Sequence, residues 1–168
     1  MFIDRIKRAT DRVIATLSII IMIALVVSVV WQVFSRYVMN QPSTLTDELA
    51  RFLMIWVGLL GAAYTVGANR HLSIDLLLTK LSPQQQAIAN ITINLLIFVF
   101  AGSVIVAGGV KLIMRTLATH QLSAAMQIPV GYIYIILPLS GVIMMFYTLC
   151  AIARTIHALR HPPTESAH

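Results

Sequence analysis

Four long stretches that carry no charged residue constrain this chain more than any other feature of its sequence. Arg12 and Arg36 bracket 23 uncharged residues. As a helix these measure about 35 Å, which exceeds the roughly 30 Å of a bilayer's hydrocarbon core. Three more such stretches lie between Arg51 and Arg70, between Lys80 and Lys111, and between Arg115 and Arg154. We therefore predict an all-α integral membrane protein with four transmembrane helices.

The composition excludes a soluble domain. Of the 168 residues, 58% are hydrophobic and 11% are charged, whereas a soluble globular domain carries about 25% charged residues. The 12 Lys and Arg outnumber the 6 Asp and Glu. They are scattered at the ends of the apolar stretches and form no basic surface with aromatic residues, so we expect the lipid bilayer and no nucleic acid as a partner. The single cysteine excludes an internal disulfide.

We predict one membrane domain over residues 1–168. A short amphipathic segment at 1–12 comes before spans at about 13–35, 46–69, 84–110 and 129–153, and a tail at 154–168 follows them. Thr46 is the expected N-cap of the second span. Residues 82–85, Ser-Pro-Gln-Gln, have the pattern of a capping box with proline at the first helical position. Pro129 opens the fourth span, and Pro138 should free the carbonyl of Tyr134 and bend it.

The segment before the first span has two interpretations. Phe2, Ile6, Ala9 and Val13 share one helical face, and charged residues occupy most of the rest. This spacing fits an amphipathic helix that lies on the inner leaflet. It equally fits a cytosolic continuation of the first span.

The Lys and Arg residues predict that both termini face the cytoplasm. With that orientation eight of them lie inside and three outside, with Arg51 one turn into the second span, as the positive-inside rule requires. The three outside residues are Arg36, Lys111 and Arg115.

Several kinds of chemistry are missing from the spans. All five histidines lie in loops or tails, where they cannot serve as axial haem ligands within helices. The only acids near a span are Asp47 and Glu48 at a helix entrance, and an independent transporter usually needs ionisable residues along its path. We detect no internal repeat. We therefore predict a protein that is not an enzyme and has no catalytic, cofactor-binding or metal-binding residue.

The densest polar constellation is at the start of the second span. Asp47, Glu48 and Arg51 are spaced so that Arg51 lies beside both carboxylates on one helical face. This group serves either a local structural pairing or a polar contact to another subunit or a soluble partner. Just after the second span, His71 and Asp75 are four residues apart, which fits a salt-bridged turn or a partner contact.

Small residues recur along the second span. Gly58 with Ala62, and Ala63 with Gly67, have the small-xxx-small spacing that lets helix backbones approach closely in lipid, and Gly61 lies among them. The spacing fits packing within the chain and packing onto a partner equally well.

These residues together are ordered and spaced as in a known family. The set comprises Arg36-Tyr37, Asp47 to Arg51, Trp56, Gly61 to Ala63, His71 and Ile74 to Leu76. It resembles the signature region of the small membrane subunit (DctQ/SiaQ-like) of TRAP transporters, the tripartite ATP-independent periplasmic transporters of bacteria and archaea. The length, the four spans and the cytoplasmic termini are also similar to that family.

The resemblance implies a function that the residues alone do not show. In that family a periplasmic substrate-binding protein captures an organic anion, such as sialic acid or a C4-dicarboxylate. A large membrane subunit moves the anion inward by an elevator-like motion coupled to a sodium gradient. The small subunit packs against the static scaffold of the large one in the inner membrane and holds no transport site.

The resemblance also implies roles for particular positions. Structural or interfacial roles are implied for Glu48, Arg51, Trp56, Gly61, His71 and Asp75. From the topology, we place contacts to a periplasmic protein at Arg36 and in the loop from Lys111 to Gln127.

Two other functions remain open from the sequence. The first is a self-sufficient small carrier or channel that assembles through its glycine-rich second helix. The second is a membrane anchor for a redox enzyme, against which the placement of the histidines argues.

Overall fold

The computed structural model describes residues 2–68 and 82–160, and within these ranges the chain is helical and has no strand. The elements are α1 (Phe2–Tyr37), α2 (Thr44–Gly67), α4 (Pro83–Phe100), the π-helix η1 (Ala101–Val106), α5 (Ala107–Ala118), α6 (Val130–Ile133) and α7 (Ile136–Arg160). Four stretches are long and apolar enough to cross a membrane: Arg5–Tyr37, Thr44–Gly67, Gln84–Ala118 and Val130–His157. The predicted all-α membrane fold with four spans is confirmed.

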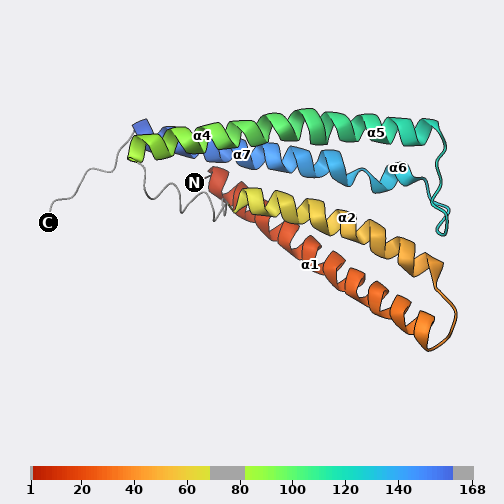
Figure 1. Cartoon of the computed structure of the whole chain (residues 1–168). Coiled ribbons are helices and arrows are strands. Elements are labelled where there is room, and N and C mark those ends of the chain that lie inside the picture. The colour runs from red at the N-terminus through yellow and green to blue at the C-terminus, as the bar shows by residue number, and fades with distance from the viewer. Residues whose placement is uncertain (1, 69–81, 161–168) are drawn as a thin grey trace.

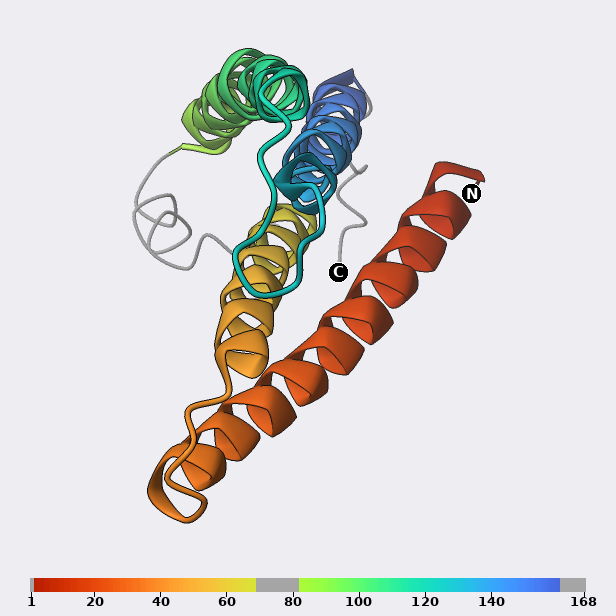
Figure 2. The ribbon, with the colours of Figure 1, turned by 90° about the vertical axis from the view of Figure 1, so that its right-hand side faces the viewer.

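α7 is the central helix of the bundle. It packs against α4, η1 and α5 on one side and against α2 on another. Figure 1 shows α7 between the α4–α5 helix and α2. α1 packs along α2, to which residues 38–43 join it, and Figure 2 shows α1 standing away from the other helices near its N-terminus. Residues 38–43 and 119–129 lie at the same end of the molecule, which we call the loop end (Figure 1).

The core lies where α1, α2 and α7 meet. Its buried side chains include Leu60 of α2, Ile136 and Tyr147 of α7, and Ile14 and Ile21 of α1. A smaller cluster of Ala63, Ala101 and Met144 joins α2 and α7 to η1. Close approach in this second region depends on Gly141, because a Cβ there would lie 2.7 Å from Val106 Cγ2.

The first two helices begin earlier than the apolar pattern predicts. α1 is continuous from Phe2, so the amphipathic segment is helical and runs directly into the first span, as in the second of the two interpretations above. α2 begins at Thr44 with Ser43 as its N-cap, so the prediction that Thr46 caps it is wrong. The hydroxyl of Thr46 instead donates to the carbonyl of Ser43 at 3.1 Å, inside the first turn.

The third span begins as predicted and ends later. The capping box at Ser82 and Gln85 is present in both directions. The helix then continues through η1 and α5 to Ala118 instead of ending near residue 110. Lys111 sets the predicted end because it is charged, but a long cationic side chain can reach the membrane interface without ending the helix.

The fourth span is broken where a bend is expected. α6 ends at Ile133, a turn covers Tyr134 and Ile135, and α7 begins at Ile136. Pro138 has no amide hydrogen to donate to the carbonyl of Tyr134, and the amide of Leu137 donates to that carbonyl instead, at 3.0 Å. The proline therefore separates two helices, and the second of them continues to Arg160.

Candidate functional site

The polar constellation at the start of α2 divides into two parts. Arg51 pairs with Asp47 at 2.6 Å, and the amide of Gln32 in α1 donates to the other oxygen of Asp47 at 2.6 Å. The Arg51 side chain is 73% exposed. The pair therefore links α2 to α1 through Gln32 and presents a guanidinium group on the surface at the loop end.

Glu48 faces away from this pair and holds a distant segment of the chain. Its carboxylate accepts hydrogen bonds from three successive backbone amides, those of Ala124 at 3.0 Å, Ala125 at 2.7 Å and Met126 at 3.0 Å. Successive amides that converge in this way form a concave anion-binding nest. The expectation that Arg51 lies beside both carboxylates is wrong for Glu48, because the nest satisfies this carboxylate.

The segment that Glu48 holds is folded by its own hydrogen bonds. Leu122 and Pro129 form an isolated antiparallel bridge, and the amide of Ser123 donates to the carbonyl of Ile128 at 2.9 Å. Ser123 is 2% exposed, and its hydroxyl accepts a bond from the amide of Met126. This part of the predicted periplasmic loop is thus an ordered structure anchored on α2.

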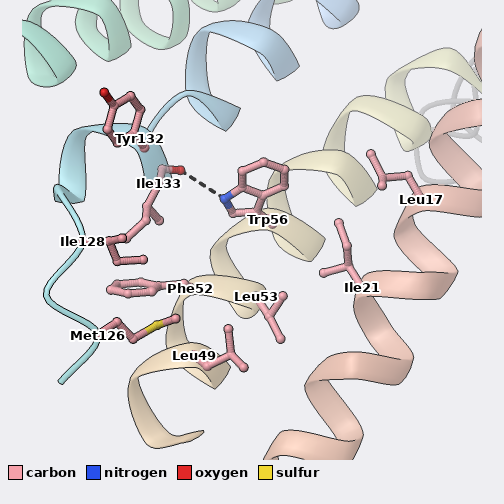
Figure 3. Close-up of a pocket in the computed structure, with 10 residues that line it drawn as sticks. All are labelled: Leu17, Ile21, Leu49, Phe52, Leu53, Trp56, Met126, Ile128, Tyr132 and Ile133. Atoms are coloured by element: carbon pink, nitrogen blue, oxygen red, sulfur yellow. Dashed lines mark hydrogen bonds between the residues drawn. The ribbon is translucent and has the colours of Figure 1, made fainter. Parts of the chain in front are cut away.

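Trp56 makes a second link between α2 and the last helices. Its indole Nε1 donates to the carbonyl of Ile133 at 3.1 Å, as Figure 3 shows. In a continuous helix this carbonyl would accept from the amide of Leu137, which here donates to Tyr134. The break between α6 and α7 therefore supplies the acceptor that Trp56 uses.

The small residues of α2 lie on two different faces. Ala63 is fully buried, and a Cβ on Gly67 would lie 2.7 Å from ring carbons of Tyr147, so this pair packs inside the chain. Gly58 and Ala62 are exposed. Nothing lies within 4 Å of a Cβ built on Gly58 or on the half-buried Gly61.

The remaining predicted site residues take no part in the contacts described above. Arg36 lies exposed in the last turn of α1, and His71 and Asp75 lie outside the described residues. Within residues 2–68 and 82–160 no group of three or more His, Cys, Asp or Glu side chains is placed to hold a metal ion. The absence of a cofactor stays a prediction.

Sequence reasoning missed the partners of the singled-out side chains. Gln32, Ser123 and the three amides of the nest carry no motif, because a backbone amide has no residue-type signature. A further missed link is the hydrogen bond from the Tyr147 hydroxyl to Asp11 at 2.5 Å, which ties α7 to α1 away from the loop end.

Comparison with known proteins shows which family this chain is similar to. The family described as "Tripartite ATP-independent periplasmic transporters, DctQ component" matches residues 25–158. The sialic acid TRAP transporter small permease protein SiaQ of Vibrio cholerae is 25% identical over 64% of this chain and 62% of its own length. A protein of Haemophilus influenzae named as a TRAP transporter small permease protein is 24% identical over 87% of this chain and 89% of its own length.

A third relative is much longer than this chain. The sialic acid TRAP transporter permease protein SiaT of Haemophilus influenzae is 33% identical over 68% of this chain, but that match covers only 18% of SiaT. The chain thus spans less than two thirds of SiaQ and under one fifth of SiaT. A polypeptide like this one forms a minor part of that larger permease.

Proposed function

Since the chain belongs to the DctQ component family of tripartite ATP-independent periplasmic (TRAP) transporters, we propose that it scaffolds a large, sodium-coupled membrane permease for organic anions. Family membership itself makes it a small permease subunit and a multi-pass protein of the bacterial inner membrane. The family is a transporter component and not an enzyme, so the alternative of a redox-enzyme anchor has no support.

The length of SiaT supports a large membrane partner. In that relative, the region similar to this chain is continuous with a much longer permease. Two polypeptides that are fused in one organism commonly act together when they are separate in another. We infer that the transport pathway lies in the partner, which agrees with the lack of acids within the described spans beyond the loop-end turn of α2 and Asp11 near the start of α1.

The observation that carries the proposal is one exposed face of α2. This open α2 face comprises Arg51, Met54, Gly58, Ala62 and Thr65, all of them exposed. Their spacing of three or four residues places them along one side of the helix. Lipid provides no hydrophobic drive between helices, so helices associate there by close packing at small residues. The face therefore suits a helix of the large permease.

The orientation and the substrate class complete the proposal. With both termini in the cytoplasm, the loop end faces the periplasm, where Arg36 and Arg51 lie within reach of a periplasmic substrate-binding protein. Two relatives carry sialic acid in their names, and this supports an organic anion as the substrate of the assembled transporter. Sodium coupling belongs to the large permease in this proposal.

Affinity purification of the tagged chain from its native membrane in mild detergent tests the scaffold role. We expect a large multi-span permease to copurify with the wild-type chain. Gly58→Leu and Ala62→Leu should each reduce its recovery by at least about fivefold, because they block close helix packing. Gly108→Leu is the matched control, since Gly108 is also exposed with nothing within 4 Å of its Cβ position but lies on α5.

Two results would contradict the proposal. Wild-type recovery of the permease with both α2 variants would remove the open α2 face from the interface. A single purified species that takes up organic anions in liposomes without any partner would replace the scaffold role by that of a self-sufficient carrier.

A further inference from the structure

An apolar crevice lies between α2, α1 and the segment that follows the loop. Its volume is about 370 Å³. Figure 3 shows its walls: Leu49, Phe52, Leu53 and Trp56 from α2, Leu17 and Ile21 from α1, and Met126, Ile128, Tyr132 and Ile133 from the segment before and within α6. None of the functions discussed above uses this space.

The walls of the crevice are held in place by two long-range links. The hydrogen bond that the amide of Met126 donates to the Glu48 carboxylate fixes one end of the 126–133 segment on α2. The bond from Trp56 to the carbonyl of Ile133 fixes the other end. The crevice is therefore formed by the fold itself and does not need an occupant to assemble it.

The lining has no free polar group on its inner side. The indole N–H of Trp56 is already bonded to Ile133. The hydroxyl of Tyr132 points away from the other lining side chains in Figure 3, and this residue is 60% exposed. A ligand that needs hydrogen bonds or a counter-charge would find none here, so the occupant is a hydrocarbon.

The size of the crevice distinguishes a lipid chain from a helix of a partner protein as its occupant. A volume of about 370 Å³ accommodates on the order of ten methylene groups if each takes about the 30 Å³ of a water molecule in the liquid. A stable protein interface buries roughly 800 Å² per partner, far more than ten side chains around a single groove provide. Part of a single lipid chain fits this size, and a helix of a partner protein does not.

We propose that this crevice binds one acyl chain of a membrane phospholipid. Because α1, α2 and Val130–Ile133 belong to membrane-spanning stretches, lipid chains surround the opening. A chain in the crevice gains dispersion contacts with fixed aromatic and aliphatic walls, which an unfilled gap would forfeit. It joins the α1–α2 hairpin to the 126–133 segment, whether or not the large permease of the proposed function is present.

The two tryptophans of the chain provide a test with an internal control. Trp56 lines the crevice, whereas Trp31 is 50% exposed and lies in an apolar hollow lined by side chains of α1 alone. A hollow on one helix has no opposite wall, so it contacts lipid without holding a single chain. We would titrate purified full-length Trp31→Phe and Trp56→Phe variants in detergent with phosphatidylcholine brominated on its acyl chains, which quenches tryptophan on contact. Quenching of Trp56 should saturate at about one lipid per chain and be reversed by unbrominated phosphatidylcholine, while quenching of Trp31 should rise without saturation.

Crevice-filling variants sharpen the test. In the Trp31→Phe background, Ile128→Phe should abolish the saturable quenching of Trp56, because Ile128 stands at the opening and is 40% exposed. Leu139→Phe is the matched control, a 46% exposed leucine of α7 that does not line the crevice. Native mass spectrometry of otherwise wild-type protein gives a second readout, in which the Leu139→Phe chain retains one phospholipid and the Ile128→Phe chain retains none.

Three results would overturn the proposal. Equal, unsaturable quenching of Trp56 and Trp31 would show only general contact with lipid. A retained phospholipid that Ile128→Phe does not displace would place the lipid elsewhere. With an added oxidant, disulfide cross-linking of Ile128→Cys to a cysteine of the copurified large permease would identify a partner side chain as the occupant, and would leave the scaffold proposal intact.

Discussion

At the scale of single residues, Glu48 has the largest structural role of the polar side chains at the loop end. Its carboxylate accepts from three amides that lie 76 to 78 residues away in the chain, and no local pairing replaces these bonds. Hydrogen bonds to an ionised acceptor are stronger than neutral ones. In the neighbouring Asp47–Arg51 pair the arginine side chain is 73% exposed and the aspartate 34%, and ion pairs near the surface contribute little.

Replacement of the carboxylate tests this difference. Glu48→Gln keeps the size of the side chain but leaves one neutral acceptor oxygen for three donors, so the 123–127 loop should open more often. We expect the amides of Ala124 to Met126 to exchange at least about tenfold faster in hydrogen-exchange mass spectrometry. Arg51→Ala serves as the control and should leave these amides nearly unchanged; equal effects of the two substitutions would contradict the role assigned to Glu48.

Gly67 illustrates how one missing methyl group determines packing. In an exposed helical position, replacing glycine by alanine stabilises a helix by about 1 kcal/mol. At Gly67 the new Cβ would meet the ring of Tyr147 at 2.7 Å, and overpacking of this kind costs typically about 1–3 kcal/mol.

We therefore expect Gly67→Ala to lower the thermal unfolding temperature in detergent and Gly108→Ala to raise it or leave it unchanged. Nothing lies within 4 Å of a Cβ at Gly108, so this control reports the helix propensity alone. A stabilised Gly67→Ala chain would show that Tyr147 moves aside without cost.

At the scale of elements, the break between α6 and α7 connects Pro138 of α7 to Trp56 of α2. Because Pro138 has no amide hydrogen, the carbonyl of Tyr134 accepts from the amide of Leu137 instead. The carbonyl of Ile133 is then without its helical donor and accepts from the indole of Trp56. Trp56 and Ile133 also line the crevice. The position of one imino acid thus determines a tertiary contact.

Pro138→Ala should join α6 to α7 into a continuous helix and remove the Trp56 link. An alanine amide at position 138 can donate to Tyr134, after which Leu137 donates to Ile133 in the ordinary helical pattern. In ¹⁵N-tryptophan NMR we expect the Trp56 indole resonance to shift and its proton to exchange faster, with the Trp31 resonance as a reference in the same spectrum. An unchanged Trp56 resonance would mean that packing and not the proline maintains the break, and Pro42→Ala controls for a general effect of proline removal.

At the scale of the whole molecule, α7 belongs to the most buried of the four spans, and the third span, formed by α4, η1 and α5, is the least buried. α1 packs mainly on α2, and most of its large apolar side chains are exposed. α7 contacts elements on several sides. A bundle of this shape leaves long helix surfaces for lipid and for a partner, as the proposed scaffold role requires.

The proposed orientation makes a prediction about the whole molecule. In a Cys150→Ala background, which has no other cysteine, Gln121→Cys at the loop end should react with a membrane-impermeant thiol reagent in intact spheroplasts. Lys7→Cys, near the start of α1, should react only after permeabilisation. The reverse pattern would invert the topology and move the loop end to the cytoplasm.

Much of the fold could be predicted from the sequence because its causes are local. Hydrophobic length and the placement of charges determine four spans, and the capping box at Ser82 and Gln85 depends on residues three positions apart. The errors are local as well. Thr46 and Ser43 are both of residue types that commonly cap helices, and Lys111 is charged without ending its helix. Residue type alone therefore places these two boundaries incorrectly.

The sequence by itself therefore determined the membrane class, the number of spans and the resemblance that family membership confirms. Only the tertiary structure decided which carboxylate pairs with Arg51, which small residues of α2 face α7 and which remain open, and which carbonyl Trp56 reaches. The physical reason is the range of the interactions. A span depends on the solvent around a continuous stretch of chain, whereas the partners of Glu48, Gly67 and Trp56 are contributed by segments that are distant in sequence and meet only when the bundle is packed.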